Sequence, residues 1–313
     1  MKNNSIISLI AAIPAFILCT VVRYIQIAGG TDFTSGFLKN ENGFLINYGF
    51  YGLVILTLAA VVALGLYDKK KGGALYTNEL PSCLTDAKAV MIGFPLVIVG
   101  SLAAYEGYAQ VNSLTPSGFL IFIDFVFGGA MLIQGFVILY KKEMGVAQGF
   151  SLIIPALYYT LRGVGVFLDR MVVASVPEYL IQCLSIIGFA SFFMLLSKLL
   201  SGNEAKHTRT ALTAVGASTA VMALSSAAAT LLADLTDPYG LSARIVSSAA
   251  EAERLTQLYL QYGSAEYYFM AYMPWVDVAM AAGILLTLAA LFMKTAPAEK
   301  SVSEAAEDSS EEN

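Results

Sequence analysis

Two stretches of the same design decide the fold: Asp124–Lys141 (DFVFGGAMLIQGFVILYK) and Asp277–Lys294 (DVAMAAGILLTLAALFMK). Each begins with an aspartate, continues for sixteen residues without a charge and ends with a lysine. At 1.5 Å per residue, the 17 steps between the two charges span about 25 Å of helix, most of the hydrocarbon core of a bilayer. Both stretches are therefore expected to be membrane helices, with a carboxylate near one membrane face and an ammonium near the other.

The composition of the whole chain agrees with this interpretation. Of the 313 residues, 57% are hydrophobic and 13% are charged, and the mean hydropathy is +0.69. Soluble domains carry about 25% charged residues, so the chain has too few polar side chains to cover a soluble core of this size. We expect an all-α integral membrane protein that contacts the lipid bilayer directly.

Apolar runs near twenty residues long recur along the chain and predict a bundle of eight transmembrane helices. The first run, 6–22, is expected to remain as a membrane helix, because no small-x-small pattern for signal-peptide cleavage follows it closely. The seventh run, 210–233, is rich in alanine, glycine and serine, which let helix backbones approach, so we expect it in the middle of the bundle. The remaining runs are 46–67, 88–106, 117–140, 149–168, 178–198 and 271–293.

Lysines and arginines of the loops set the expected orientation. Twelve of these 18 residues fall on the side that carries both termini, and six fall on the other side. Both termini are therefore expected in the cytoplasm, with the protein in the plasma membrane. Tyrosines gather at the outer ends and, with Trp275, predict an aromatic belt. They are Tyr24, Tyr48, Tyr51, Tyr105, Tyr108, Tyr158, Tyr159, Tyr179, Tyr267 and Tyr272.

The membrane domain is expected to cover 1–294. Its long outer loop, 234–270, has apolar residues at helical spacing from Leu241 to Tyr262. This pattern predicts an amphipathic helix that either lies on the membrane surface or covers the bundle from outside. The tail 295–313 is acidic and poor in apolar side chains, so it is expected to be disordered in the cytoplasm.

An internal likeness suggests a duplication. Ser8–Ala15 (SLIAAIPA) resembles Ser151–Ala156 (SLIIPA), and the two Asp-to-Lys stretches close the fourth and the eighth span. This pattern predicts two parallel four-helix repeats, 1–142 and 143–294, related by an axis along the membrane normal. The alternative of coincidence stays open, because any helix that runs from outside to inside tends to begin with an acid and end with a lysine.

Ionisable residues within the spans are the candidates for a functional site, because burial without a partner is costly for them. Counting residues along each helix places two arginines and two aspartates at a similar depth, in the outer part of the membrane. Arginine–carboxylate pairs there would form a polar pocket for an ion, a proton or a small zwitterion. The other interpretation is that these groups mark the outer interface and extend to water. The candidates are Arg23, Glu106, Asp124, Gln134, Arg162 and Asp277.

Other kinds of site have little support. The single histidine, His207, excludes a His-rich metal site, and the three cysteines imply no disulfide framework. The chain has no phosphate-binding loop, no paired-His zinc motif and no basic patch for nucleic acid, so we expect no cofactor, no metal and no catalytic residue. An intramembrane enzyme that uses the paired carboxylates is the weakest hypothesis, because no nucleophile accompanies them.

Two functions stay open. The first is a small-solute or ion transporter, in one form proton-coupled, with an outward-facing site made of the arginines and aspartates. The second is a membrane sensor or accessory subunit that binds a membrane-protein partner and transports nothing. Transport predicts a polar cavity that reaches toward the bilayer midplane and is lined by at least two of the four charges, whereas a sensor or subunit predicts a filled core.

Overall fold

The computed structural model describes residues 10–30, 43–72, 84–111, 118–142, 146–170, 177–236 and 275–293. All regular structure in these ranges is helical. The predicted amphipathic helix 241–262 and the acidic tail lie outside the described residues. The elements are α2 (Ala12–Ile25), the π-helical turn η1 (Gln26–Gly30), α3 (Phe44–Lys70), α5 (Asp86–Val111), α6 (Gly118–Lys141), α7 (Val146–Ser151), α8 (Ile153–Arg170), α9 (Pro177–Leu200), α10 (Thr208–Thr236) and α13 (Trp275–Phe292).

Seven helices of the described part are long and apolar enough to cross a membrane. They are α2 with its η1 extension, α3, α5, α6, α9, α10 and α13, and they match seven of the eight expected runs. The remaining run, 149–168, falls on α7 and α8. Because α8 carries Arg162, Asp169 and Arg170 within its 18 residues, it is more polar than the others, and the count of eight is not confirmed.

Pro155 explains why the run 149–168 is divided. A proline has no backbone N–H to donate, and its ring clashes with the carbonyl four residues earlier unless it lies in the first turn of a helix. Accordingly, α7 ends at Ser151 and α8 begins at Ile153, which places Pro155 in the first turn of α8. The longer α5 continues through its own proline, Pro95.

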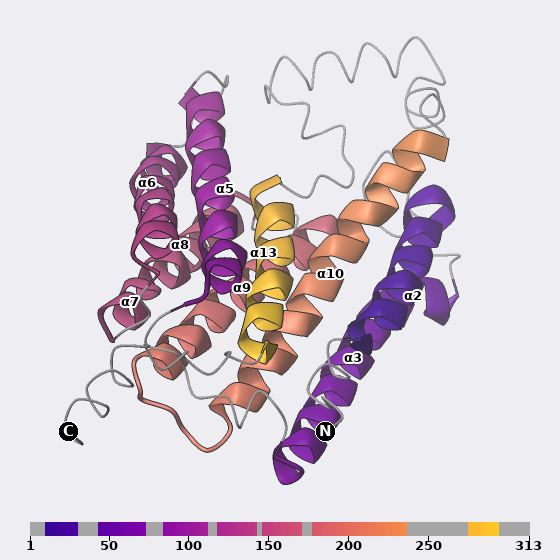
Figure 1. The fold of residues 1–313 in the computed structure, drawn as a ribbon. Coiled ribbons are helices and arrows are strands. Elements are labelled where there is room, and N and C mark those ends of the chain that lie inside the picture. Colours follow the sequence, from indigo (N-terminus) through magenta and orange to yellow (C-terminus); the bar gives the residue numbers. More distant parts are fainter. Residues whose placement is uncertain are drawn as a thin grey trace, which may run out of the picture.

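The helix α10 lies in the middle of the arrangement (Figure 1). It contacts α2 and α3 on one side and α9 and α13 on the other. Small side chains along it are buried, including Ala217, Ala220, Ser225 and Ser226. Small side chains let neighbouring backbones come close, so the expected central position of run 210–233 is confirmed.

The helices α5 and α6 pack backbone to backbone. A Cβ atom on Gly100 would lie 2.6 Å from the carbonyl oxygen of Gly128, and one on Gly135 would lie 2.7 Å from that of Gly93. These distances leave no room for a side chain, so the glycines set the separation of the two helices. This close pair holds Glu106 and Asp124, which lie toward the same end of α5 and α6.

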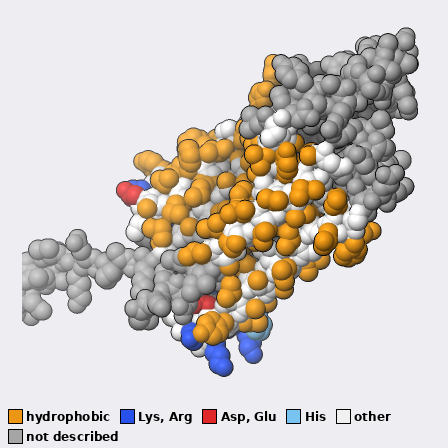
Figure 2. Space-filling model, turned by 90° about the vertical axis from the view of Figure 1, so that its right-hand side faces the viewer, with side chains coloured by type: hydrophobic (Ala, Val, Ile, Leu, Met, Phe, Trp, Pro, Cys, Tyr) orange, Lys and Arg blue, Asp and Glu red, His pale blue; other side chains and the backbone are white. Residues whose placement is uncertain are grey.

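The sides of the bundle are apolar. Figure 2 shows hydrophobic side chains over the whole described part of the face to which α2 and α3 belong, with Lys and Arg gathered mainly toward one end. Ile13, Ile17, Leu45, Ile55 and Leu56 are among the exposed large side chains. So wide an apolar surface is suited to lipid rather than to water. The architecture is that of a multi-pass helical membrane protein.

The two four-helix repeats, 1–142 and 143–294, stay a prediction. As such repeats require, α2 packs on α3 and α8 packs on α9, while α5 packs on α6 and α10 packs on α13. However, α10 also contacts α2 and α3, and α5 also contacts α13, so helices of the two halves are interleaved.

Candidate functional site

Arg162 joins three helices through its side chain. It lies on α8, and its Nη2 donates to Oε2 of Glu106 on α5 at 2.8 Å. Its Nη1 lies 3.6 Å from Oδ1 of Asp124 on α6. The residue counts along the spans place Arg162 and Asp124 at one level, and Glu106 joins them there. Charge-assisted hydrogen bonds of this kind are the strong ones, so this network holds α8 against the α5–α6 pair.

Tyr158 completes the link between Arg162 and Asp124. Its hydroxyl accepts from Nη1 of Arg162 at 2.5 Å and donates to Oδ1 of Asp124 at 3.1 Å. Tyr158 precedes Arg162 by four residues, so both side chains lie on one face of α8. That spacing is the sequence signal that could have assigned Tyr158 to the site.

Asp277 lies close to this network but stays apart from it. It is in the first turn of α13 and has no exposed surface. Arg162, Glu106 and Asp124 act on it electrostatically, yet neither of its carboxyl oxygens has a hydrogen-bond partner within the described part of the chain. Buried carboxylates are normally paired or hydrogen-bonded, so an unpartnered carboxyl group is the exceptional feature of this site.

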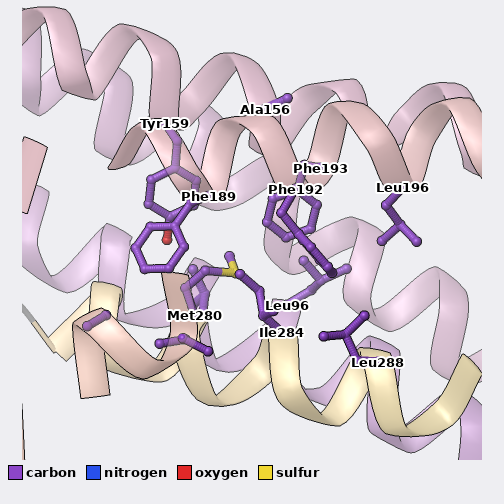
Figure 3. Close-up of a cluster of buried hydrophobic side chains, with 14 of the residues drawn as sticks. Leu96, Ala156, Tyr159, Phe189, Phe192, Phe193, Leu196, Met280, Ile284 and Leu288 are labelled. Carbon is purple, nitrogen blue, oxygen red and sulfur yellow. The ribbon is translucent and has the colours of Figure 1, made fainter. Parts of the chain in front are cut away.

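Tyr159 provides a second buried polar group without a partner. Its side chain is fully buried and its hydroxyl makes no hydrogen bond. The ring centroid lies 4.9 Å from that of Phe189 on α9. Figure 3 shows the side chain of Tyr159 directed from α8 toward α13, among Phe189 and Met280. Asp277 acts on Tyr159 electrostatically, so the two unpartnered groups share one region of the core.

The charged residues were interpreted either as a polar pocket inside the bundle or as markers of the outer interface. For three of them, burial distinguishes between these interpretations. The exposed fraction is 6% for Arg162, 3% for Asp124 and 0% for Asp277. Groups that extended to interfacial water would remain accessible, so these three do not simply mark the membrane surface. Glu106 has the most accessible side chain of the network, with 22% exposed. It is therefore the member of the network that can be reached most easily from outside the bundle.

Arg23 lies in a different part of the bundle. Its Nη1 donates to Oε1 of Gln26 at 3.0 Å, and its guanidinium lies 5.9 Å from the ring centroid of Phe50 on α3. Its helix, α2, packs on α3 and α10, whereas α8 packs on α6 and α9. Depth counted along the sequence therefore did not tell which helices are neighbours.

Gln134 also lies away from Arg162. Its Nε2 donates to the hydroxyl of Ser151 at 2.9 Å, so it links α6 to α7. Gln134 is ten residues, almost three turns, beyond Asp124 on α6, which places it about 15 Å deeper along the helix. The structure does not bring it into the network.

Of the tyrosines predicted for the belt, Tyr24 and Tyr51 are half-buried, and the side chains of Tyr179, Tyr267 and Tyr272 lie outside the described part of the chain. Tyr48, Tyr105 and Tyr108 are well exposed, as a belt requires. Tyr158 and Tyr159 have no exposed surface and belong to the core and the candidate site, so their assignment to the belt was wrong. A tyrosine near the membrane boundary is suited to the lipid interface and to the protein core. Its depth in the membrane therefore could not distinguish these two positions.

Comparisons with family models, with curated proteins and with solved structures found no match to this chain.

The charges of the site do not balance. Three carboxyl groups and one guanidinium meet here among the described side chains, and no described cation besides Arg162 acts on Asp277. Within the described residues no group of three His, Cys, Asp or Glu side chains could hold a metal ion. The arrangement is therefore suited to binding a proton or a cationic group, and to releasing it when the ion pairs rearrange.

Proposed function

We propose that this protein is a small-solute or ion transporter coupled to protons, and that the network of Arg162, Glu106, Asp124 and Asp277 is its site. The observation that carries the proposal is the excess of buried carboxyl groups over cations at the meeting point of four helices. Ionisable groups inside membrane bundles mark substrate pathways and proton relays, because burial is too costly to keep without a use.

The ion pairs suggest how coupling would work. Glu106 is the most accessible partner of Arg162. A solute that carries a carboxylate could replace Glu106 on the guanidinium, since both present the same pair of oxygens. With the solute's carboxylate added to the site, proton uptake by a carboxyl group there would become more favourable, because an unpaired buried charge is unfavourable. Solute and proton would thus bind together.

The test uses the purified full chain in liposomes that hold a pH-sensitive dye. Candidate amino acids, monocarboxylates, sugars and alkali cations are added outside, one class at a time. We expect at least one class to acidify the interior, and the Asp124→Asn/Asp277→Asn double variant to lose this signal. The matched control is Asp86→Asn. Asp86 is 85% exposed and pairs with Lys142 at the end of α5 and α6 opposite to the site.

The outcome separates the two functions. No acidification with any class, or a signal that the double variant retains, would overturn the proposal. The alternative is a sensor or accessory subunit. The close packing of α5 and α6 favours it, because this function requires no cavity between the two helices. In that case a membrane-protein partner should co-purify with the chain while the liposome assay stays silent.

A further inference from the structure

We propose that Asp277 is the proton-binding residue of this bundle and that it holds its proton in the conformation described here. The inference deepens the proposed function by assigning the proton to one carboxyl group. It starts from geometry: a carboxyl group with no exposed surface, two oxygens that accept from no described donor, and a position in the first turn of α13.

The other carboxyl groups of the site each have a partner. Glu106 accepts a hydrogen bond from Arg162, and Asp124 accepts one from Tyr158 besides lying 3.6 Å from the guanidinium. Arg162 therefore has its two terminal nitrogens engaged by groups other than Asp277. A carboxylate at Asp277 would add a third negative charge around one cation.

Within the described part of the chain, no donor hydrogen-bonds to the carboxyl group of Asp277, and this region of the core is largely apolar. Tyr159, Phe189 and Met280 form an aromatic and apolar wall between α8, α9 and α13 (Figure 3). The described groups that act on Asp277 are Arg162 from α8, Glu106 from α5 and Asp124 from α6. Among the described side chains, α9 and α10 add no charge to this set.

A helix start would ordinarily favour a carboxylate, because the first-turn N–H groups are free to donate. Neither oxygen of Asp277 accepts such a hydrogen bond. The acid therefore gains only the dipole of α13, without the directed contacts that stabilise a capping carboxylate. A neutral carboxylic acid avoids the penalty that an unpaired buried charge would incur.

A proton suits this position better than a metal cation does. Hard cations such as Ca²⁺ and Mg²⁺ require about six or more oxygen ligands. Besides the two oxygens of Asp277, the unpartnered buried oxygens on the described parts of α5, α8 and α9 are Oε1 of Glu106, the hydroxyl of Tyr159 and, one turn before Phe189, that of Ser185. No group of three metal-binding side chains is present among the described residues. A proton needs only one carboxyl oxygen.

Loss of this proton would change the ion pairs of the site. An ionised Asp277 would compete with Glu106 and Asp124 for Arg162, since all three act on the same guanidinium. The side chain of Arg162 connects α8 to α5 and α6, so its movement would loosen those helices from one another. Proton release is thereby linked to a change in helix packing.

The test is infrared spectroscopy of the purified full chain in lipid nanodiscs near neutral pH. A protonated carboxylic acid gives a C=O stretching band that a carboxylate lacks. We expect one such band in the wild type, its loss in Asp277→Asn, and its retention in Asp124→Asn and in the exposed control Asp86→Asn. A band that is absent from the wild type, or that Asp277→Asn retains, overturns the inference.

A second measurement covers the case in which Asp277→Asn fails to fold. Wild-type protein labelled with ¹³C-aspartate should show the same band shifted by the isotope, whereas labelled glutamate should not shift it. Trp275, the only tryptophan of the chain, lies two residues before Asp277, so its emission should change when raised pH removes the band. A band without any transport refutes the proposed function alone, and transport without a band refutes this inference alone.

Discussion

Replacing Arg162 with glutamine should be among the most destabilising single changes in this protein. The variant removes the guanidinium from two carboxyl groups, one at 2.8 Å and one at 3.6 Å, in a place where the side chain of Arg162 is only 7% exposed. At an effective dielectric constant of about 20, two unit charges about 4 Å apart attract each other by about 4 kcal/mol. Removing one member of a buried ion pair accordingly costs about 3–5 kcal/mol.

The assay is equilibrium unfolding in mixed micelles of SDS and a mild detergent, followed by helical circular dichroism. The matched control is Arg209→Gln. Arg209, the second residue of α10, also lies 2.8 Å from a carboxylate, that of Glu204 in the preceding loop, whose side chain is 34% exposed. A pair that water can reach contributes about 1 kcal/mol or less, so the control should lose much less stability.

A third variant tests the cause of the loss. In a Glu106→Gln/Asp124→Asn background, Arg162→Gln should lower the unfolding free energy by about 1–3 kcal/mol less than it does in the wild type. The reason is that this background has no carboxylates that the loss of Arg162 could leave unpaired. The reasoning is refuted if Arg162→Gln and Arg209→Gln destabilise equally, or if the background makes no difference.

Three further changes probe packing, hydrogen bonding and orientation. Gly100→Ala should lower the unfolding free energy by about 1–3 kcal/mol in the same micelle assay, because its Cβ would lie 2.6 Å from backbone atoms of α6. Tyr158→Phe should cost about 1.5–3 kcal/mol in that assay, because its hydroxyl bonds two charged groups. Asn203→Cys, placed between α9 and α10 in a chain without other cysteines, should react with an impermeant maleimide only after cells are opened.

Each of these changes has a matched partner in the chain. Gly129→Ala meets nothing within 4 Å and should not destabilise α6, so equal losses at both glycines would contradict the packing argument. Tyr159→Phe removes a hydroxyl without a partner and should be nearly neutral, and a larger loss there than at Tyr158 would contradict the hydrogen-bond network. Gly43→Cys, before α3, should react in intact cells, and the reverse pattern would invert the orientation.

The sequence predicts depth better than it predicts neighbours. Apolar runs located seven spans, and counting residues along the helices placed Arg162 and Asp124 at one level, where the structure pairs them. The same counting placed Arg23 at that level too, although it lies on a helix that packs elsewhere. Lateral arrangement depends on close contacts such as that of Gly100 with Gly128, and a hydropathy pattern does not encode which glycines face each other.

The site itself was predictable only in part. Charges inside apolar runs pointed to Glu106, Arg162 and Asp277, because such residues are rare and stand out. Tyr158 and Tyr159 did not stand out, since a tyrosine near the membrane boundary is as well suited to the lipid interface as to the core. Pro155 was a signal for the division of 149–168 into α7 and α8, because a proline fits best in the first turn of a helix, but it does not decide alone, since α5 continues through Pro95.

The small side chains of α10 have a mechanical consequence. Helices resist sliding past each other because the ridges of one fit into the grooves of the next, and ridges made of alanine and serine are shallow. The α2–α3 pair meets the rest of the bundle largely through α10. A shift of that pair along α10 would therefore require few side chains to change rotamer, and the two parts of the bundle could move against each other while the Arg162 network, which lies wholly on one side, stays intact.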